Sequence, residues 1–374
     1  MSEQNLTKTG KKSKKSTIFN IVLITVVILA VILVIILNGD IEVTWNTLIH
    51  ANLNWVLAAF GCWVGFVLLD AFFMQAFFIQ QGIRIGYHHN IYVALIGMFY
   101  SNVTPAATGG QPMQVMSLKR RGVNPGISST GVAVKFFCWQ LALLMAGTAL
   151  WIFNPDALDL TGKPIAFIVL GYLLNGAAVA VVFLLALRPR AVTGLINFVL
   201  KAGSKLHLIK NPDATRQKME HSIDEFNSSV DMIKNHPFQL IRLIMIEILQ
   251  VVSLMSITYF VYRAVGLSEV DYLDILTIQT LLYITVSFFP LPGAAGAQEI
   301  GFSGFFKGVF GETCSAAMLI WRFFTYYIMI LLGLVGVVED SVAAAMHKGG
   351  KRERIKKTVK GAAVEKQKSD QKDP

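Results

Sequence analysis

Two short stretches of the sequence carry the same residue types at the same spacing. The first reads PAATGGQP from Pro105, and the second reads PGAAGAQE from Pro292. In each stretch a glycine follows the proline by four residues and a glutamine follows it by six. Proline and glycine interrupt helices, and a helix that restarts after such a break has free N–H groups and about half a positive charge at its N-terminus. The predicted chemistry is the binding of an anion, such as phosphate, at both breaks.

The first break is followed by the signature of a short helix. Thr108 or Gly109 can cap that helix, and Pro112 suits its first turn. Three basic residues fill the expected last turn, and Gly122 suits the stop. The second break offers a similar helix start from Gly296 onward. The candidate binding residues are therefore Thr108, Gly109, Gly110, Gln111 and Pro112 at the first break, and Pro292, Gly293, Gly296, Gln298 and Glu299 at the second.

Both breaks also have a purely structural explanation. Small residues are common where membrane helices touch, so the glycines could serve close packing alone. Glu299 has a local alternative role as well, because a carboxylate in the first turn of a helix stabilises that end.

Four charged residues lie inside apolar stretches, namely Asp70, Lys135, Glu247 and Arg322. A charge inside a bilayer is costly, so such residues mark a functional site by default, and the alternative is an internal ion pair that fixes packing. A buried guanidinium needs an acceptor, and we expect Arg322 to pair with Glu299 or with a phosphate. Glu339 and Asp340 are expected at the membrane edge, exposed to water.

The elements that must position these residues are membrane helices. Hydrophobic residues make up 54% of the 374 residues and charged residues 15%, against about 25% charged in a soluble domain. We predict an all-α polytopic membrane protein, because several apolar runs have the length of a transmembrane helix. About six full spans are expected, at 18–37, 55–79, 127–153, 164–187, 238–263 and 314–338. Two shorter apolar pieces, at 91–103 and 272–289, each end in one of the breaks.

Positive charges predict the orientation. Both tails, the segment 119–121 and the 188–237 loop are rich in Lys and Arg, whereas the 38–54 and 154–163 loops carry mainly Asp and Glu. Basic segments face the cytoplasm, so both termini are predicted on that side of a bacterial cytoplasmic membrane. This requires an even number of crossings. The two shorter pieces are therefore predicted to be re-entrant hairpins that enter from opposite sides and belong to inverted repeats.

The predicted organisation has three parts: a basic cytoplasmic tail at 1–17, a transmembrane domain at 18–340 and a Lys-rich cytoplasmic tail at 341–374. An amphipathic cytoplasmic helix is expected near 213–235, because apolar residues recur there at spacings of three and four. The net charge of +10 lies mostly in tails and loops beside apolar runs. It is therefore a topology signal rather than a sign of nucleic-acid binding.

Neither a catalytic centre nor a cofactor site is apparent in the sequence. The three cysteines are isolated in apolar runs, and His88 and His89 have no partner ligands nearby. We therefore expect neither a disulfide framework nor a metal site, and no cofactor. The GxxxxGK[ST] phosphate-binding motif is absent from the sequence, so direct use of ATP is not expected.

Three motifs resemble the lysylphosphatidylglycerol synthase transmembrane-region family: GGQPMQVMSLKRRG, PLPGAAGAQE and WRFFTYYIMILLG. The resemblance covers about residues 15–340. That family includes the flippase-like membrane domain of the bacterial multiple peptide resistance factor and many stand-alone relatives. The resemblance implies movement of phospholipids, such as aminoacylated phosphatidylglycerol, between leaflets. It also makes a lipid phosphate the expected form of the phosphate partner of Arg322.

The chain departs from the family pattern in two places. Gln111 stands where the family usually has Glu, and Ala294 and Ala295 stand where it has a glycine pair. The first change removes a charge from the predicted site, which weakens the prediction of a cationic headgroup. The bifunctional relatives carry a large C-terminal aminoacyl-transfer domain, whereas this chain ends 34 residues after Asp340.

Three functions remain open at this point. The chain is a flippase-like transporter whose partner is a membrane phospholipid, a phosphatidylglycerol lysyltransferase, or a non-transporting membrane scaffold. A homo-oligomer is compatible with all three.

Overall fold

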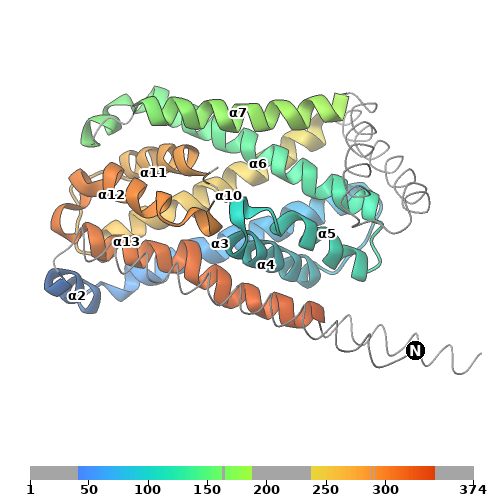
Figure 1. The fold of residues 1–374 in the computed structure, drawn as a ribbon, viewed down its shortest axis with the longest axis horizontal. Coiled ribbons are helices and arrows are strands. Elements are labelled where there is room, and N and C mark those ends of the chain that lie inside the picture. The colour runs from blue at the N-terminus through green and yellow to red at the C-terminus, as the bar shows by residue number, and fades with distance from the viewer. Residues whose placement is uncertain (1–40, 162–164, 188–236, 288, 290, 342–374) are drawn as a thin grey trace, which may run out of the picture.

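A computed structural model describes residues 41–161, 165–187, 237–287, 289 and 291–341. Within these residues every regular element is a helix, and the long helices run side by side (Figure 1). The all-α prediction is therefore confirmed for this part of the chain. The predicted span at 18–37, both tails and the predicted helix near 213–235 lie outside the described residues.

Four helical stretches among the described residues are long and apolar enough to cross a membrane. They are α3 (Leu53–Gln80), α6 (Pro125–Phe153), α10 (Pro237–Ala264) and the last stretch, which ends at Ser341. At 1.5 Å per residue, α3 is about 40 Å long, which exceeds the roughly 30 Å of a bilayer core. Three of the predicted spans coincide with α3, α6 and α10 to within a few residues. The span predicted at 164–187 coincides with α7 (Ile165–Leu187).

Local capping explains where two of the long helices begin. The Asn52 side chain accepts a hydrogen bond of 3.0 Å from the backbone N–H of Asn54, at the start of α3. The Asn124 side chain does the same for Gly126 at 2.9 Å, and Pro125 occupies the first position of α6. Asparagine before a helix and proline at its first position both favour a helix start.

The two shorter apolar pieces are helices that end in a turn, as the sequence predicts. The first unit consists of α4 (Tyr87–Val103), the 3₁₀ turn η1 (Pro105–Ala107) and α5 (Gly110–Arg120). The second unit consists of α11 (Tyr272–Val286), the 3₁₀ turn η3 (Pro292–Ala294) and α12 (Ala297–Phe310). In Figure 1, α4 and α5 lie in the right-hand half of the molecule, and α11 and α12 lie in the left-hand half.

The two turns share an unusual backbone conformation. Ala106 and Ala107 have φ angles of 51° and 53°, and Gly293 and Ala294 have φ angles of 56° and 48°. Residues other than glycine rarely adopt such angles, which are strained and concentrate at functional sites. In both turns, the two residues that follow the proline have positive φ angles.

The equivalence extends to both sides of the turns. Thr104 and Leu291, the residues before the two prolines, are both extended, with ψ angles of 144° and 153°. The following helices begin at Gly110 and Ala297. These pairs have the same spacing, so the backbone of the two units matches from Thr104 to Ala107 and from Leu291 to Ala294. It then differs, because Gly109 has a φ of −83° and Gly296 a φ of 83°.

The last helical stretch is interrupted immediately after Arg322. It begins with η4 (Gly311–Thr313) and α13 (Cys314–Arg322), passes through the π-helical turn η5 (Phe323–Tyr327), and continues as a helix over residues 328–341. A π turn shifts the register of a helix by one residue and often marks a functional site. Here it follows the one arginine that was predicted inside this span.

Two short elements complete the described fold at the end shown on the left of Figure 1: α2 (Ile41–Ile49) and the 3₁₀ helix η2 (Pro155–Leu160). The core between the long helices is apolar, and α3 and α10 pack closely along it. A side chain at Gly65 would approach the Ser253 hydroxyl to 2.9 Å, so glycine permits this contact.

The positive φ at position 294 predicts how substitutions there act. Ala294→Gly should raise the free energy of unfolding by about 0.5–1 kcal/mol, because glycine adopts this backbone region without strain, and Ala294→Val should lower it by roughly 1–2 kcal/mol. Thermal unfolding of purified protein in detergent measures both. The matched control is Ala295→Gly, because Ala295 has a φ of −57°. Stabilisation by Ala295→Gly to the same extent would contradict the explanation from backbone strain.

Candidate functional site

A cavity with a volume of about 300 Å³ lies where the two broken helices meet. Its wall includes Ala107 and Gln111 from the first unit and Ala294 and Gln298 from the second. The turns η1 and η3 also contact each other directly. The two breaks, which the sequence placed half a chain apart, therefore line one shared cavity rather than two separate ones.

Charged side chains at and behind this wall come from four helices. Asp70 of α3, Lys135 of α6 and Arg322 of α13 line the cavity. Glu299 lies behind the wall, where it contacts Arg322. Glu247 of α10 is fully buried and is not among the lining residues. The structure thus places four of the five predicted charges at the cavity or in contact with it.

Amide side chains are the commonest polar groups of the wall. Five glutamines line it: Gln111, Gln114, Gln250, Gln279 and Gln298. Three of them, Gln114, Gln250 and Gln279, were missed by the sequence analysis. The available signal was an amide inside an apolar helix, because burying such a group without a hydrogen bond is costly.

At the first break Gly109, one of the two predicted residues, is the cap, and a hydroxyl other than that of Thr108 binds its N–H. The hydroxyl of Thr104, not of Thr108, accepts a hydrogen bond of 2.8 Å from the backbone N–H of Gly109. Thr108 donates its hydroxyl to the carbonyl oxygen of Pro105 at 2.9 Å, so it closes the turn. Gly109 is the cap residue and Pro112 lies in the first turn, as predicted.

The remaining glycines of this unit have steric reasons. A side chain at Gly110 would collide with Ser101, so glycine allows α5 to approach α4. Gly122 has a φ of 87° and follows the last turn of α5, which confirms the predicted stop.

At the second break, the Glu299 carboxylate binds both the start of α12 and Arg322. Glu299 Oε2 accepts a hydrogen bond of 2.6 Å from the backbone N–H of Gly296, which has a φ of 83°. Glu299 Oε1 accepts from Nε and Nη2 of Arg322, both at 2.6 Å. Both side chains are at most 3% exposed. The two explanations for Glu299, helix capping and ion pairing, therefore hold together, and the first of the two acceptors proposed for Arg322 is the one in this structure.

Arg322 is held by further contacts with the turn and the π-helical segment. Its Nη1 and Nη2 atoms donate to the carbonyl oxygen of Gly293 at 3.4 Å. Its guanidinium lies 5.1 Å from the ring centre of Tyr326, a favourable cation–π distance. A side chain at Gly293 would collide with that same ring, so glycine at this position lets the turn reach the arginine.

Asp70 and Lys135 form an ion pair that joins α3 to α6. Gln250 of α10 donates a hydrogen bond of 3.3 Å to Asp70 Oδ2, and so adds a third helix. The prediction that charged residues pair inside the protein fits these two residues. Glu247 differs, because neither of its carboxyl oxygens has a hydrogen-bond partner among the described residues.

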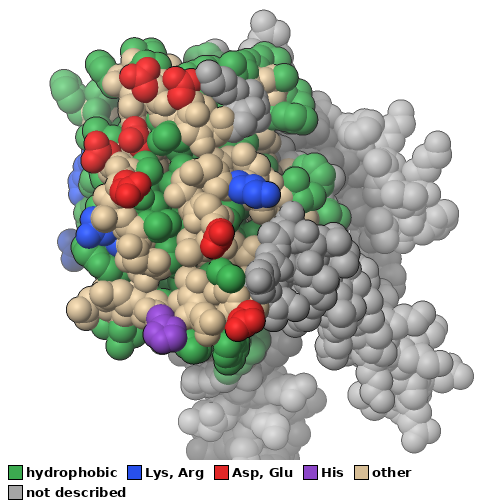
Figure 2. All heavy atoms as spheres, turned by 90° about the vertical axis from the view of Figure 1, so that its left-hand side faces the viewer, with side chains coloured by type: hydrophobic (Ala, Val, Ile, Leu, Met, Phe, Trp, Pro, Cys, Tyr) green, Lys and Arg blue, Asp and Glu red, His purple; other side chains and the backbone are tan. Residues whose placement is uncertain are grey.

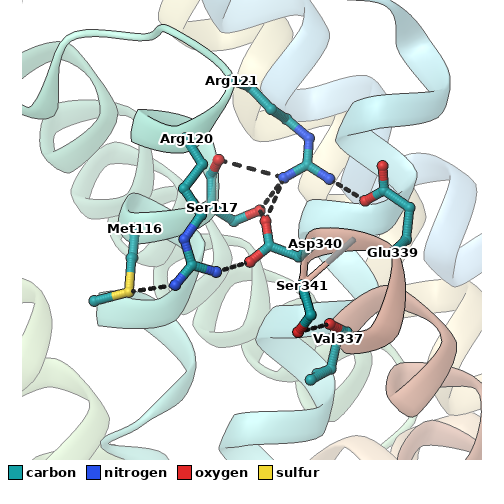
Figure 3. A network of polar contacts seen from close by, with 8 residues as sticks. All are labelled: Met116, Ser117, Arg120, Arg121, Val337, Glu339, Asp340 and Ser341. Atoms are coloured by element: carbon teal, nitrogen blue, oxygen red, sulfur yellow. Dashed lines mark hydrogen bonds and ion pairs between the residues drawn. The ribbon is translucent and has the colours of Figure 1, made fainter. Parts of the chain in front are cut away.

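A second polar cluster lies at the opposite end of α5 and ties it to the end of the last helix (Figure 3). Asp340 pairs with Arg120 and accepts hydrogen bonds from Arg121 at 2.7 Å and from Ser117 at 2.8 Å. Arg121 also pairs with Glu339. The expectation that Asp340 is exposed to water is wrong: it is 3% exposed, because this cluster surrounds its carboxylate.

Among the described residues, no group of three or more His, Cys, Asp or Glu side chains could hold a metal ion. The polar groups at the cavity include Arg322, Lys135, Asp70, several amides and the start of α5. Helix N-termini, cations and amides can bind anions and hydroxyl groups.

Fold and site together define a helical membrane protein with a polar cavity between two broken helices. The chain matches the family described as "Lysylphosphatidylglycerol synthase TM region" over residues 21–333, and it belongs to that family. The family resemblance that the three motifs indicated is thereby confirmed.

Two relatives show how widely this architecture is shared. The chain is 24% identical to a UPF0104 membrane protein of Archaeoglobus fulgidus over 311 residues, which is 79% of this chain and 89% of that protein. It is 21% identical to a UPF0104 membrane protein of Pyrococcus horikoshii over 318 residues, or 81% of this chain and 92% of that one.

The buried Arg322–Glu299 pair predicts a pattern of mutant stabilities. Arg322→Gln should destabilise the protein by about 3–5 kcal/mol, because it leaves the Glu299 carboxylate buried without its partner. The double change Arg322→Gln with Glu299→Gln should recover most of that loss, since no charge remains stranded. Thermal unfolding of wild type, both single variants and the double variant measures the coupling. As a control, Arg263→Gln removes an arginine that contacts the ring of Trp55 and should cost about 1 kcal/mol or less. Additive effects of the two single changes would contradict the pairing.

Proposed function

We propose that this protein is a flippase-like lipid transporter, which moves an anionic or aminoacylated phospholipid of the phosphatidylglycerol type between leaflets. The observation that carries the proposal is a cavity between two broken helices, which has charged and amide side chains in its wall and two turns with the same pair of positive φ angles. Non-helical backbone inside a bilayer is tolerated only where protein buries it or where it lines a wet cavity. Broken helices in corresponding positions of two repeats are typical of the substrate sites of transporters.

The polar groups of the cavity suit a phosphodiester headgroup. The N-terminus of α5 begins beside the cavity, and its cap Gly109 has no side chain to occupy the free N–H groups. Such an end attracts a phosphate. Arg322 and Lys135 supply positive charge, although each is paired with a carboxylate in this conformation. A phosphate would therefore compete with Glu299 or Asp70 for these cations.

The amides of the wall suit the remainder of the headgroup. Glutamine both donates and accepts hydrogen bonds, which matches the hydroxyl groups of a glycerol headgroup. The Gln298 side-chain oxygen is buried and has no partner among the described residues. We propose the candidate residues of both breaks as the headgroup site, together with Arg322 and the amides around it.

The transport mechanism that we propose is rocking of the two repeats around the fixed cavity. The two units would enter the membrane from opposite sides as re-entrant hairpins. The cluster of Arg120, Arg121, Glu339 and Asp340 in Figure 3 joins the first hairpin to the end of the last helix. Opening of the cavity at that end would require this cluster to separate.

The charge distribution supports cytoplasmic termini. Figure 2 shows the end of the molecule that lies on the left in Figure 1, with acidic side chains spread over it. Acidic residues are in excess at the described loops and helix ends there, which carry Glu42, Asp156, Asp159, Glu269, Asp271, Asp274 and Glu312 together with Arg263 and Lys307. Basic residues are in excess at the other end, which carries Arg84, Lys119, Arg120 and Arg121 together with Glu339 and Asp340. Basic ends face the cytoplasm, which supports a transmembrane domain over 18–340 flanked by cytoplasmic tails at 1–17 and 341–374.

Two alternatives are tested by the same experiment. The description of the family includes a lysylphosphatidylglycerol synthase, which corresponds to a phosphatidylglycerol lysyltransferase. A membrane scaffold would need neither the cavity nor its amides. Purified protein in liposomes with labelled phosphatidylglycerol separates the three: headgroup movement supports transport, consumption of aminoacyl-tRNA supports the transferase, and neither supports the scaffold.

A substitution of Gln298 tests the proposed headgroup site in the transport assay. Gln298→Leu should slow headgroup movement by about three- to tenfold, because a hydrogen bond to the headgroup is lost, whereas the fold should tolerate a change that removes an unsatisfied buried group. The matched control is Gln80→Leu, since the Gln80 amide is also without a described partner but does not line the cavity. Equal rates for wild type and Gln298→Leu would remove Gln298 from the proposed site.

The orientation predicts which side of the membrane labels two exposed positions. Ser268→Cys lies in the loop before α11 and His88→Cys lies at the start of α4, both in a background without Cys62, Cys138 and Cys314. A membrane-impermeant thiol reagent should label the first only from outside and the second only from the cytoplasmic side. Labelling of both cysteines from one side would contradict the proposed topology.

A further inference from the structure

Glu247 is a carboxyl group that the headgroup site does not use. It lies near the middle of the sequence of α10, is 0% exposed, and has no hydrogen-bond partner for either oxygen among the described residues. An ionised carboxylate in such a place would be strongly disfavoured, because nothing replaces the water that it has lost. Burial without a partner therefore favours the neutral, protonated form of this carboxyl group.

The neighbours of Glu247 are the charged residues of the cavity wall. Lys135 of α6 and Asp70 of α3 are the charged groups that act on it electrostatically, and Cys138 of α6 is the further titratable group beside it. Lys135 and Cys138 lie one turn apart on α6, so one face of α6 is turned toward Glu247. Among the described residues, no charged group of α11 or α13 adds to this set.

The same helix face connects Glu247 to the cavity. Gln250 lies one turn after Glu247 on α10, lines the cavity, and donates to Asp70 Oδ2 at 3.3 Å. The helices α3, α6 and α10 pack against one another and hold this cluster together. Two acids and one ammonium group thus form a chain that runs from the buried Glu247 to the wall of the cavity.

We propose that Glu247 is a proton-binding site and that Lys135 couples its occupancy to the binding of an anion in the cavity. Two states of the cluster follow. In the first, Lys135 pairs with Asp70 and Glu247 holds a proton, so the three groups have no net charge. In the second, Glu247 has released its proton to water, Lys135 is shared between two carboxylates, and the net charge is −1.

An anion that enters the cavity favours the first state. The anion adds negative charge beside Lys135 and Asp70, so the ionised form of Glu247 becomes less stable. Binding of the proton and binding of the anion therefore strengthen each other, and by linkage each raises the affinity for the other by the same factor. A transporter built in this way would move the headgroup and the proton in the same direction. This coupling to lipid rests on the proposed function, whereas the proton site itself does not.

A proton suits this site better than a metal ion. The ammonium group of Lys135 already provides the positive charge between the two acids. A metal ion would have to displace it and would find only two carboxylates there. The coupling ion that we infer is therefore H⁺.

Infrared difference spectroscopy of the full chain in phosphatidylcholine nanodiscs tests the proton site directly. Wild type should show a band of a buried protonated carboxyl that disappears as the pH is raised, and Glu247→Gln should lack it. Glu269→Gln, which changes an exposed carboxylate, is the matched control and should retain the band. Glutamine resembles the protonated acid, so the variant should fold, and its thermal unfolding verifies this. Absence of a titrating band in wild type, or its persistence in folded Glu247→Gln, would overturn the proton site.

The coupling is tested with sn-glycerol 3-phosphate as a soluble probe of the cavity. Addition of the probe should move the disappearance of the band to higher pH in wild type and not in Lys135→Gln. No shift in wild type would overturn the link to the anion and leave the proton site in place.

A transport measurement separates this inference from the proposed function. In liposomes, a gradient of about one pH unit should bias phosphatidylglycerol across the membrane by up to about tenfold for one-to-one coupling. Glu247→Gln should move lipid without responding to the gradient. Lipid movement that ignores the gradient in wild type refutes proton coupling and supports the transporter, whereas no lipid movement at all refutes the transporter.

Discussion

Backbone that leaves a helix inside a bilayer must find hydrogen-bond partners within the protein. The whole central architecture follows from that constraint at the two breaks. Each turn closes on itself through a 3₁₀ hydrogen bond, Thr108 N–H to Pro105 O at 3.2 Å and Ala295 N–H to Pro292 O at 3.0 Å. The two turns contact each other, and Ala106, Ala107, Gly293 and Ala294 line the cavity, so their backbone faces protein and the cavity. The cavity exists because two such breaks share one place.

The buried ion pairs of the membrane domain also provide polar partners within the protein. Each ion pair joins elements that are distant in sequence: Asp70 with Lys135 across α3 and α6, and Glu299 with Arg322 across α12 and α13. The pairs compensate the loss of water and also make the cavity electrically neutral in this conformation. In a neutral cavity, each of the two cations can exchange its carboxylate partner for the anion of the substrate. This suits a substrate that is bound and then released, because the anion replaces an existing partner instead of meeting an unpaired charge.

The residues with strained backbone angles lie at the two turns. Alanine at positive φ appears at both turns, and at the second turn the family pattern described above has glycine in place of both Ala294 and Ala295. The angle of 48° at Ala294 explains a preference for glycine there, while the φ of −57° at Ala295 gives no such reason. Strain of this kind persists only where surrounding contacts enforce it, and the contact of η3 with η1 and with Tyr326 provides them.

The sequence by itself determined the class of protein, the positions of the long helices and the two breaks, because these depend on local composition, capping and the spacing of proline and glycine. It also indicated that a buried Arg322 requires an acceptor, with Glu299 and a phosphate as the two candidates, and the structure shows Glu299 in that role. Only the tertiary structure decided that both breaks line one cavity and that Asp340 is buried against two arginines. The physical reason is that these features arise from contacts between segments far apart in the chain, and local pattern carries no information on which buried polar groups will meet.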